Sequence, residues 1–286
     1  MPFNRSSKQM TLVGLAILLV ASYYPMLLMT GRTLISSEEM AHGFFAPIVA
    51  GYLVWCKRDV ILNPTSRPSA WSLPLLAVAA CVGIASTLAM SSTFSRFGFL
   101  ISLAGCLLLL GGWTALKSFA FPLALLLYTF PIPDVLYGEI TQPLQLMATR
   151  LSEFFLEFLG YSVIRDGNIL RLSYMTLSVV EACSGLRSLI TLSFFCLVYA
   201  YLFEDRLWIR VLVTLLAIPA AIFVNVLRIS STAILGKYNQ EWTRGTYHEV
   251  VGWSGFFVGF LLVFLLHLFI HRLSRSSISE SIPVSQ

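Results

Sequence analysis

The sequence predicts an all-α polytopic membrane protein, because of its composition, the length of its apolar segments and the placement of its basic residues. Of the 286 residues, 57% are hydrophobic and 12% are charged, whereas about 25% of a typical soluble domain is charged. The mean hydropathy is +0.80. The net charge of +5 comes from basic residues scattered between apolar runs, which argues against a nucleic-acid partner. These residues are better explained as determinants of membrane topology.

About eight segments are predicted to cross the membrane, since a helix needs roughly 20 apolar residues to do so. They are residues 10–30, 43–56, 71–91, 97–114, 118–132, 184–203, 207–233 and 250–270. Eight crossings place both termini on one side. The loops and tails of that side carry more lysines and arginines than the opposite short loops, which hold Arg32, Arg96, Lys237 and Arg244. The positive-inside rule therefore predicts an N-in, C-in topology.

The segment 133–183 is predicted to lie on the outer side as a short amphipathic helix followed by a β-hairpin. Apolar residues recur there at helical spacing, at Leu136, Ile140, Leu144, Met147, Leu151, Phe154 and Phe158. This helix either packs on its neighbours or lies in the outer membrane interface. Over residues 161–180 the pattern changes to alternation around Asp166-Gly167, a dipeptide that favours a tight hairpin. Residues 1–273 form one membrane-embedded domain in this interpretation, and residues 274–286 form a disordered cytoplasmic tail.

Cys183 is the one cysteine in a polar setting, within EACSGLR at residues 181–187, where a membrane-spanning helix is predicted to begin. The other four cysteines lie in or beside apolar runs, where cysteine acts as a small hydrophobe. No CxxC pair or Cys/His metal spacing occurs, so no metal site and no cofactor are predicted. In the first turn of a helix, backbone N–H groups and the helix dipole favour a thiolate. Cys183 is therefore a candidate nucleophile, with simple packing as the alternative.

Two further side chains are predicted at the same membrane depth. Arg228 lies about 20 residues into the seventh span, which is roughly 30 Å along a helix and reaches the outer edge of the hydrocarbon core. A charged side chain at this depth is costly unless it has a functional role or an ion-pair partner, or unless it extends to the lipid headgroups. His248 is expected in the outer loop before the eighth span, with His42 as the competing histidine. His267 and His271, at the cytoplasmic end of the last span, are interpreted as interface anchors.

This combination of side chains suits covalent acyl transfer. A thiolate attacks a carbonyl and forms a thioester, and histidine protonates the leaving amine and then activates the incoming nucleophile. A guanidinium stabilises the oxyanion and stays charged when desolvated. Two alternatives stay open: a transporter or flippase of lipid-linked saccharides in which Arg228 binds phosphate, and a cysteine-dependent membrane acyltransferase.

The chain resembles the exosortase/archaeosortase family through three motifs in order: EACSGLR at 181–187, NVLRIS at 225–230 and YHEVVGW at 247–253. The resemblance implies a membrane cysteine transpeptidase acting on exported proteins with a C-terminal sorting signal of the PEP-CTERM kind, made of a short motif, a transmembrane helix and a basic cluster. The cleaved protein would pass to a membrane lipid or another amine acceptor. Cys183 would be the nucleophile, Arg228 the stabiliser of the tetrahedral intermediate and His248 the general acid/base.

Four neighbouring polar residues are further candidates for substrate binding: Glu181, Arg187, Asn225 and Glu249. Arg187 could hold carbonyls of the tag or a lipid phosphate, and Asn225 could orient the arginine one turn away. The alternative for all four is the satisfaction of buried polar groups. The resemblance also implies the inner membrane of exopolysaccharide-producing cells, with the active site on the periplasmic side. A substrate tethered by its own helix would reach that site at high effective concentration.

Overall fold

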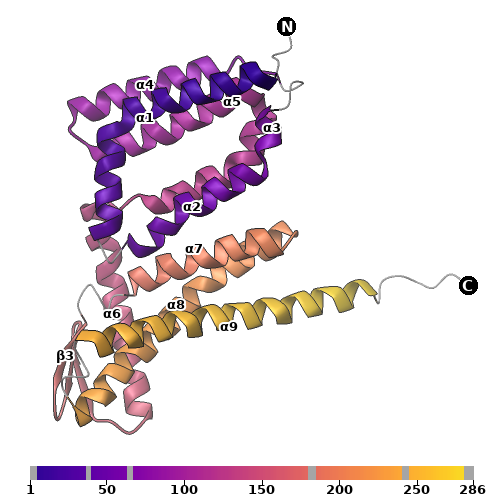
Figure 1. The fold of residues 1–286 in the computed structure, drawn as a ribbon. Coiled ribbons are helices and arrows are strands. Elements are labelled where there is room, and N and C mark those ends of the chain that lie inside the picture. Colours follow the sequence, from indigo (N-terminus) through magenta and orange to yellow (C-terminus); the bar gives the residue numbers. More distant parts are fainter. Residues whose placement is uncertain (1–4, 37–39, 63–66, 180–184, 240–244, 280–286) are drawn as a thin grey trace, which may run out of the picture. The chain divides into compact units, whose positions relative to one another are not determined.

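The computed structural model describes residues 5–36, 40–62, 67–179, 185–239 and 245–279, and it is 84% helical, as the sequence predicts (Figure 1). The helices are α1 (Arg5–Ser36), α2 (Ala41–Cys56), α3 (Arg58–Leu62), α4 (Ser72–Leu88), α5 (Ser92–Leu125), α6 (Asp134–Phe158), α7 (Leu186–Phe203), α8 (Leu207–Tyr238) and α9 (Gly245–Ser279). A short 3₁₀ helix, η2 (Leu126–Thr129), follows α5. Three strands follow α6: β1 (Val163–Asp166), β2 (Ile169–Leu172) and β3 (Thr176–Ser178).

Within these described ranges, five helices are long and apolar enough to cross a membrane, and α2 and α4 are apolar but shorter. The multi-pass membrane class is therefore supported, while eight crossings with both termini inside stay a prediction. α9 runs to Ser279, so residues 274–279, assigned from sequence to the tail, are helical. Residues 280–286 lie outside the described part of the chain.

The helix α5 is a hairpin of two antiparallel arms that reverses at Gly112. This glycine has φ 64° and ψ −157°, a conformation open essentially to glycine alone. The rings of Phe97 and Phe130 lie 6.4 Å apart, although a straight helix would separate these positions by roughly 50 Å. The reversal falls inside the predicted span 97–114, two residues before its end, and the next predicted span begins at residue 118.

Replacing Gly112 with alanine should destabilise the protein strongly. The new Cβ would collide with the carbonyl oxygen of Arg67, and the backbone conformation would be strained. We expect a loss of about 2–4 kcal/mol in the free energy of unfolding, measured by thermal unfolding of the detergent-purified protein. Gly51→Ala is the matched control, because a Cβ there meets no atom within 4 Å. Equal melting temperatures for the two variants would contradict the assigned reversal.

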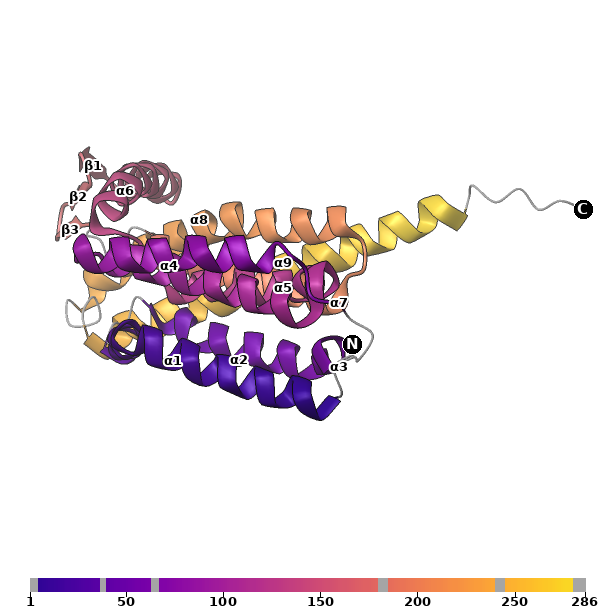
Figure 2. The ribbon, with the colours of Figure 1, turned by 90° about the horizontal axis from the view of Figure 1, so that it is seen from above.

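Contacts between Cα atoms divide the chain into two compact units, Met1–Pro133 and Asp134–Gln286, which are described separately. In the first unit α4 packs along α5 (Figures 1 and 2). A buried cluster joins α3 to both arms of α5 through Ile61, Leu110, Ala115 and Phe119. His42 is also buried in this unit, at 3% exposure.

In the second unit α7, α8 and α9 pack around a common core. Small and branched residues allow close contact between the three helices. The buried members are Leu192, Cys196, Ala200, Ile209, Val213, Ala217, Ala220, Ala221 and Val263. Gly259 of α9 lies close to α7 and α8, since a Cβ there would lie 3.2 Å from side chains of both Leu192 and Val224.

A buried polar cluster lies where α7 ends, and it corrects the interpretation of His267 as an interface anchor. His267 is only 4% exposed; its Nδ1 lies 2.7 Å from the Tyr199 hydroxyl, and its Nε2 lies 3.3 Å from a Glu204 carboxylate oxygen. Burial alone would raise the pKa of the Glu204 carboxyl. The hydrogen bond from the Arg206 amide and the contacts with His267 and His271 outweigh burial, so this pKa lies below its ordinary value. The cluster was not predictable from sequence, because its carboxylate comes from the loop after α7 and its histidine from α9.

The predicted amphipathic helix exists as α6, and most of its apolar stripe is exposed. Six of the seven residues of the stripe are exposed: Leu136, Ile140, Met147, Leu151, Phe154 and Phe158. The other side of α6 is buried and holds small or hydroxyl side chains in addition to Leu156. Ala148 and Leu156 pack there against Ile229 and Ala233 of α8. Of the two alternatives left by the sequence, an interfacial location fits this exposure better.

The β-hairpin predicted after α6 is present and has a third strand. β1 and β2 pair antiparallel with Asp166 opposite Ile169, so the turn residues are Gly167 and Asn168, and Gly167 has φ 61°. β3 adds to β2 and was missed because three residues are too few to show alternation. An ion pair of 2.8 Å between Arg165 and Glu153 joins β1 to α6.

Candidate active site

Helix α8 carries Asn225 and Arg228 three residues apart, so both lie on one side of the helix. Asn225 is 2% exposed, and Arg228 is half-buried. The Arg228 carbonyl accepts a hydrogen bond of 2.9 Å from the Thr232 hydroxyl. Each of the two side chains lies against a glycine from a different sequence motif.

Asn225 lies against Gly185, the described end of the cysteine motif. Gly185 is the N-cap of α7 and has φ 83° and ψ −8°, in the left-handed region that favours glycine. A Cβ at this position would lie 2.9 Å from Asn225 Nδ2 and 3.1 Å from its Cγ. The beginning of α7 and the Asn225 amide therefore leave no room for a side chain between them. α7 begins at Leu186, two residues after the predicted residue 184, so position 183 precedes its first turn and the prediction that Cys183 lies in that turn is wrong.

Arg228 lies against Gly252, within the histidine motif. A Cβ at position 252 would lie 3.6 Å from the guanidinium carbon and 3.7 Å from Nε and Nη2. Position 248 precedes Gly252 by four residues in α9, and positions four apart share a helix face. The prediction that His248 belongs to a loop is wrong, because α9 begins at Gly245; hydropathy marks where apolar residues begin, which is later than the helix start. The side chains of His248 and Glu249 lie outside what the structure describes.

The chain just before the cysteine motif packs in a buried cluster with residues of the sheet, α6 and α8. Val179 is 1% exposed and belongs to the same buried cluster as Ile229 and Ala233 of α8. Asn168 forms two hydrogen bonds with Val179. The Val179 amide donates to the Asn168 carbonyl at 2.8 Å, and Asn168 Nδ2 donates to the Val179 carbonyl at 3.1 Å. Residues 180–184, with Glu181 and Cys183, lie outside the described ranges. On either side of them, Gly185 lies against Asn225 of α8, and Val179 belongs to the buried cluster that includes Ile229 and Ala233 of α8.

The remaining candidates are placed as follows. Arg187 lies in the first turn of α7 and is partly buried. The ring of His42 packs edge-on against Tyr128, with centroids 6.2 Å apart, and its burial favours a structural role for this competing histidine. Sequence reasoning missed Gly185 and Gly252 as functional positions. The signal available in the sequence was their place in two motifs: Gly185 follows Cys183 by two residues, and Gly252 follows His248 by four.

A small cavity beside the asparagine limits what can bind directly at this point. It measures about 10 Å³ and is lined by Gly185, Asn225, Leu144, Met147 and neighbouring residues of α7 and α8. A cavity needs roughly 10–15 Å³ to hold one water molecule. Asn225 is therefore packed between α6 and α7, which suits a positioning role better than direct contact with a peptide.

These features define a multi-pass helical membrane protein in which one helix, α8, contacts both the cysteine motif and the histidine motif. The chain belongs to the transmembrane exosortase family (Exosortase_EpsH), whose family model matches residues 34–265, and this confirms the resemblance seen in the sequence. Exosortases are generally membrane cysteine peptidases or transpeptidases. No curated protein and no solved structure matches the chain.

Proposed function

We propose that this protein is a cysteine transpeptidase that cleaves the C-terminal sorting signals of exported proteins at the outer face of the cytoplasmic membrane. The observation that carries the proposal is the double contact of α8, which lays Asn225 against Gly185 and Arg228 against Gly252. Cys183 precedes Gly185 by two residues, which keeps their Cα atoms within about 7.6 Å of each other. The nucleophile and the histidine would thus converge on the Arg228 guanidinium.

The reaction follows from these roles. The Cys183 thiolate attacks the scissile carbonyl, and Arg228 stabilises the negative charge on its oxygen. The carbon–nitrogen bond then breaks, protonated His248 donates its proton to the leaving amine, and a thioester forms. His248, now neutral, takes a proton from an incoming lipid or other amine acceptor, which attacks the thioester and releases the thiolate. Glu181, Arg187 and Glu249 are proposed to hold the tag beside the nucleophile, and Asn225 positions the start of α7.

The proposed location at the outer face depends on the membrane topology. The reversal at Gly112 supports two separate crossings within α5, and so eight in all. The exposed apolar stripe of α6 supports an interfacial helix beside the site, where a tethered substrate arrives by lateral diffusion. The basic loops then place both termini in the cytoplasm.

The direct test is co-expression of the chain with an exported reporter that ends in a short motif, a transmembrane helix and a basic cluster. We expect a shortened reporter in cells that express the chain and an unprocessed reporter in cells without it. An unprocessed reporter in cells whose membranes contain the chain would contradict the proposal. A flippase of lipid-linked saccharides would leave the reporter intact and need Arg228 alone, and an acyltransferase would form a lipid adduct on Cys183.

Replacing His248 with alanine should lower the processing rate about 100- to 10,000-fold, because general acid–base catalysis contributes this much. The matched variant is His42→Ala, for which we expect a rate near that of the parent. Both rates come from a pulse-chase measurement of reporter cleavage, normalised to the amount of each protein in the membrane. Full activity of His248→Ala together with loss of activity in His42→Ala would move the acid/base role to His42.

A further inference from the structure

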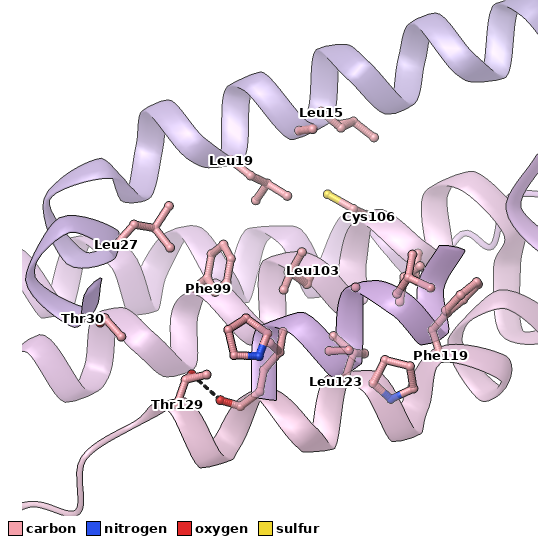
Figure 3. A pocket seen from close by; sticks show the side chains of 18 of the residues that line it. Leu15, Leu19, Leu27, Thr30, Phe99, Leu103, Cys106, Phe119, Leu123 and Thr129 are labelled. Atoms are coloured by element: carbon pink, nitrogen blue, oxygen red, sulfur yellow. Dashed lines mark hydrogen bonds between the residues drawn. The ribbon is translucent and has the colours of Figure 1, made fainter. Parts of the chain in front are cut away.

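The first unit contains an elongated apolar cavity between α1, α2 and the two arms of α5 (Figure 3). Its volume is about 550 Å³, and α1 contributes lining residues over positions 12–34. Figure 3 shows Leu19, Leu103 and Cys106 pointing into the space between α1 and α5. Nearly all of the lining is hydrocarbon, and Thr30 and Thr129 are its hydroxyl-bearing residues.

A buried arginine lies beside the threonine of α1. Arg96 is 4% exposed, and its Nε donates a hydrogen bond of 3.5 Å to the Thr30 hydroxyl. Phe99, one turn further along α5, also lines the cavity. Within the part of the chain that the structure describes, no carboxylate forms an ion pair with Arg96. A buried guanidinium is costly unless an anion and hydrogen-bond acceptors accompany it.

Size and charge together indicate the occupant. A transmembrane helix about 10 Å wide and 30 Å long occupies roughly 2,400 Å³, which is far more than this cavity offers. The volume instead lies in the range of roughly 300–1,000 Å³ that is usual for small-molecule sites. An elongated apolar cavity can hold a hydrocarbon chain, and an arginine can form bidentate hydrogen bonds with a phosphate.

We propose that this cavity binds one hydrocarbon chain of an anionic phospholipid, whose phosphate lies against Arg96. The site is separate from the chemistry of Cys183 and goes beyond the proposed function. A lipid held in this way would fill the space between α1, α2 and α5 and neutralise the buried guanidinium.

The test counts lipids on the full-length, detergent-purified protein by native mass spectrometry. The probes are phosphatidylglycerol and a diacylglycerol with the same chains, which lacks the phosphate. We expect the parent protein to retain one phosphatidylglycerol at least about tenfold more than diacylglycerol, and Arg96→Gln to lose this preference. Equal retention of the two lipids by the parent, or an unchanged preference in a folded Arg96→Gln protein, would overturn the phosphate contact.

A glycine pair tests the cavity itself. Gly51 lines the cavity and Gly14 does not, and a Cβ at either position meets no atom within 4 Å. Gly51→Phe should fill the cavity and lower retention of phosphatidylglycerol about tenfold, whereas Gly14→Phe should match the parent. Equal retention by the two variants would overturn the site, and this comparison holds even if Arg96→Gln fails to fold. Cys183→Ala should bind the lipid like the parent, so failure of the lipid site and failure of the proposed reaction are distinguishable.

Discussion

Replacing Cys183 with alanine should abolish processing of a tagged reporter while the protein stays folded in the membrane. The reaction proposed above needs a thiolate that bonds to the scissile carbonyl, and alanine has no atom that can replace it. Loss of the catalytic nucleophile in a serine protease, which uses related chemistry, costs on the order of 10⁶-fold in kcat. The reporter should therefore remain at full length in an immunoblot of cells that express the variant.

The matched control is Cys81→Ala, because Cys81 is exposed on α4 and lies in the first unit. We expect this variant to process the reporter at the parental rate. A Cys183→Ala protein that processes the reporter normally would rule out the transpeptidase mechanism. A transporter would leave the reporter intact in the parent as well, so processing by the parent and by Cys81→Ala, together with its loss in Cys183→Ala, separates the two classes of function.

Replacing Arg228 with glutamine should lower the processing rate about 100- to 1,000-fold, the usual cost of removing an oxyanion donor. The Arg228 guanidinium lies against Gly252 of α9, within the histidine motif. Arg228→Lys keeps the charge but loses the planar guanidinium and its fixed set of hydrogen-bond donors, so we expect it to retain only part of the activity. The loss should fall on kcat, since the negative charge on the carbonyl oxygen is absent from the bound substrate and develops on the way to the tetrahedral intermediate.

Arg171→Gln controls for the loss of one positive charge in the same unit. Arg171 forms an exposed ion pair of 2.9 Å with Asp166 in the sheet, and exposed pairs of this kind contribute little. We expect it to process the reporter like the parent. A parental rate in Arg228→Gln would contradict the oxyanion role, and an equal loss in Arg171→Gln would indicate a general effect of charge.

Much of the architecture was predictable because apolar length and helical spacing are strong signals. Hydropathy placed the start of α8 at the residue where it begins, and the spacing of Leu136 to Phe158 predicted α6. Counting along the seventh span predicted that Arg228 lies near the cysteine and histidine motifs, and its contact with Gly252 agrees with this. The contact between Asn225 and Gly185 links α8 to the cysteine motif in the same way.

Other features depend on tertiary contacts that leave little trace in sequence. Hydropathy predicted two spans in this region, 97–114 and 118–132, but it did not predict that the chain reverses at Gly112, inside the first of them. His267 was misinterpreted because its partners, Tyr199 and Glu204, come from another helix and from a loop. The cavity beside Arg96 arises from the packing of three helices, and its lining residues resemble any other apolar positions.

The thioester on Cys183 can be detected by mass spectrometry of the peptide that contains residues 181–187, taken from protein quenched with acid during turnover of a tagged substrate. We expect a peptidyl adduct on Cys183 whose mass equals that of the substrate portion upstream of the cleaved bond, and no such adduct in the Cys183→Ala protein. A fatty acyl adduct at Cys183, or a processed substrate without any adduct at this residue, would contradict the proposed mechanism.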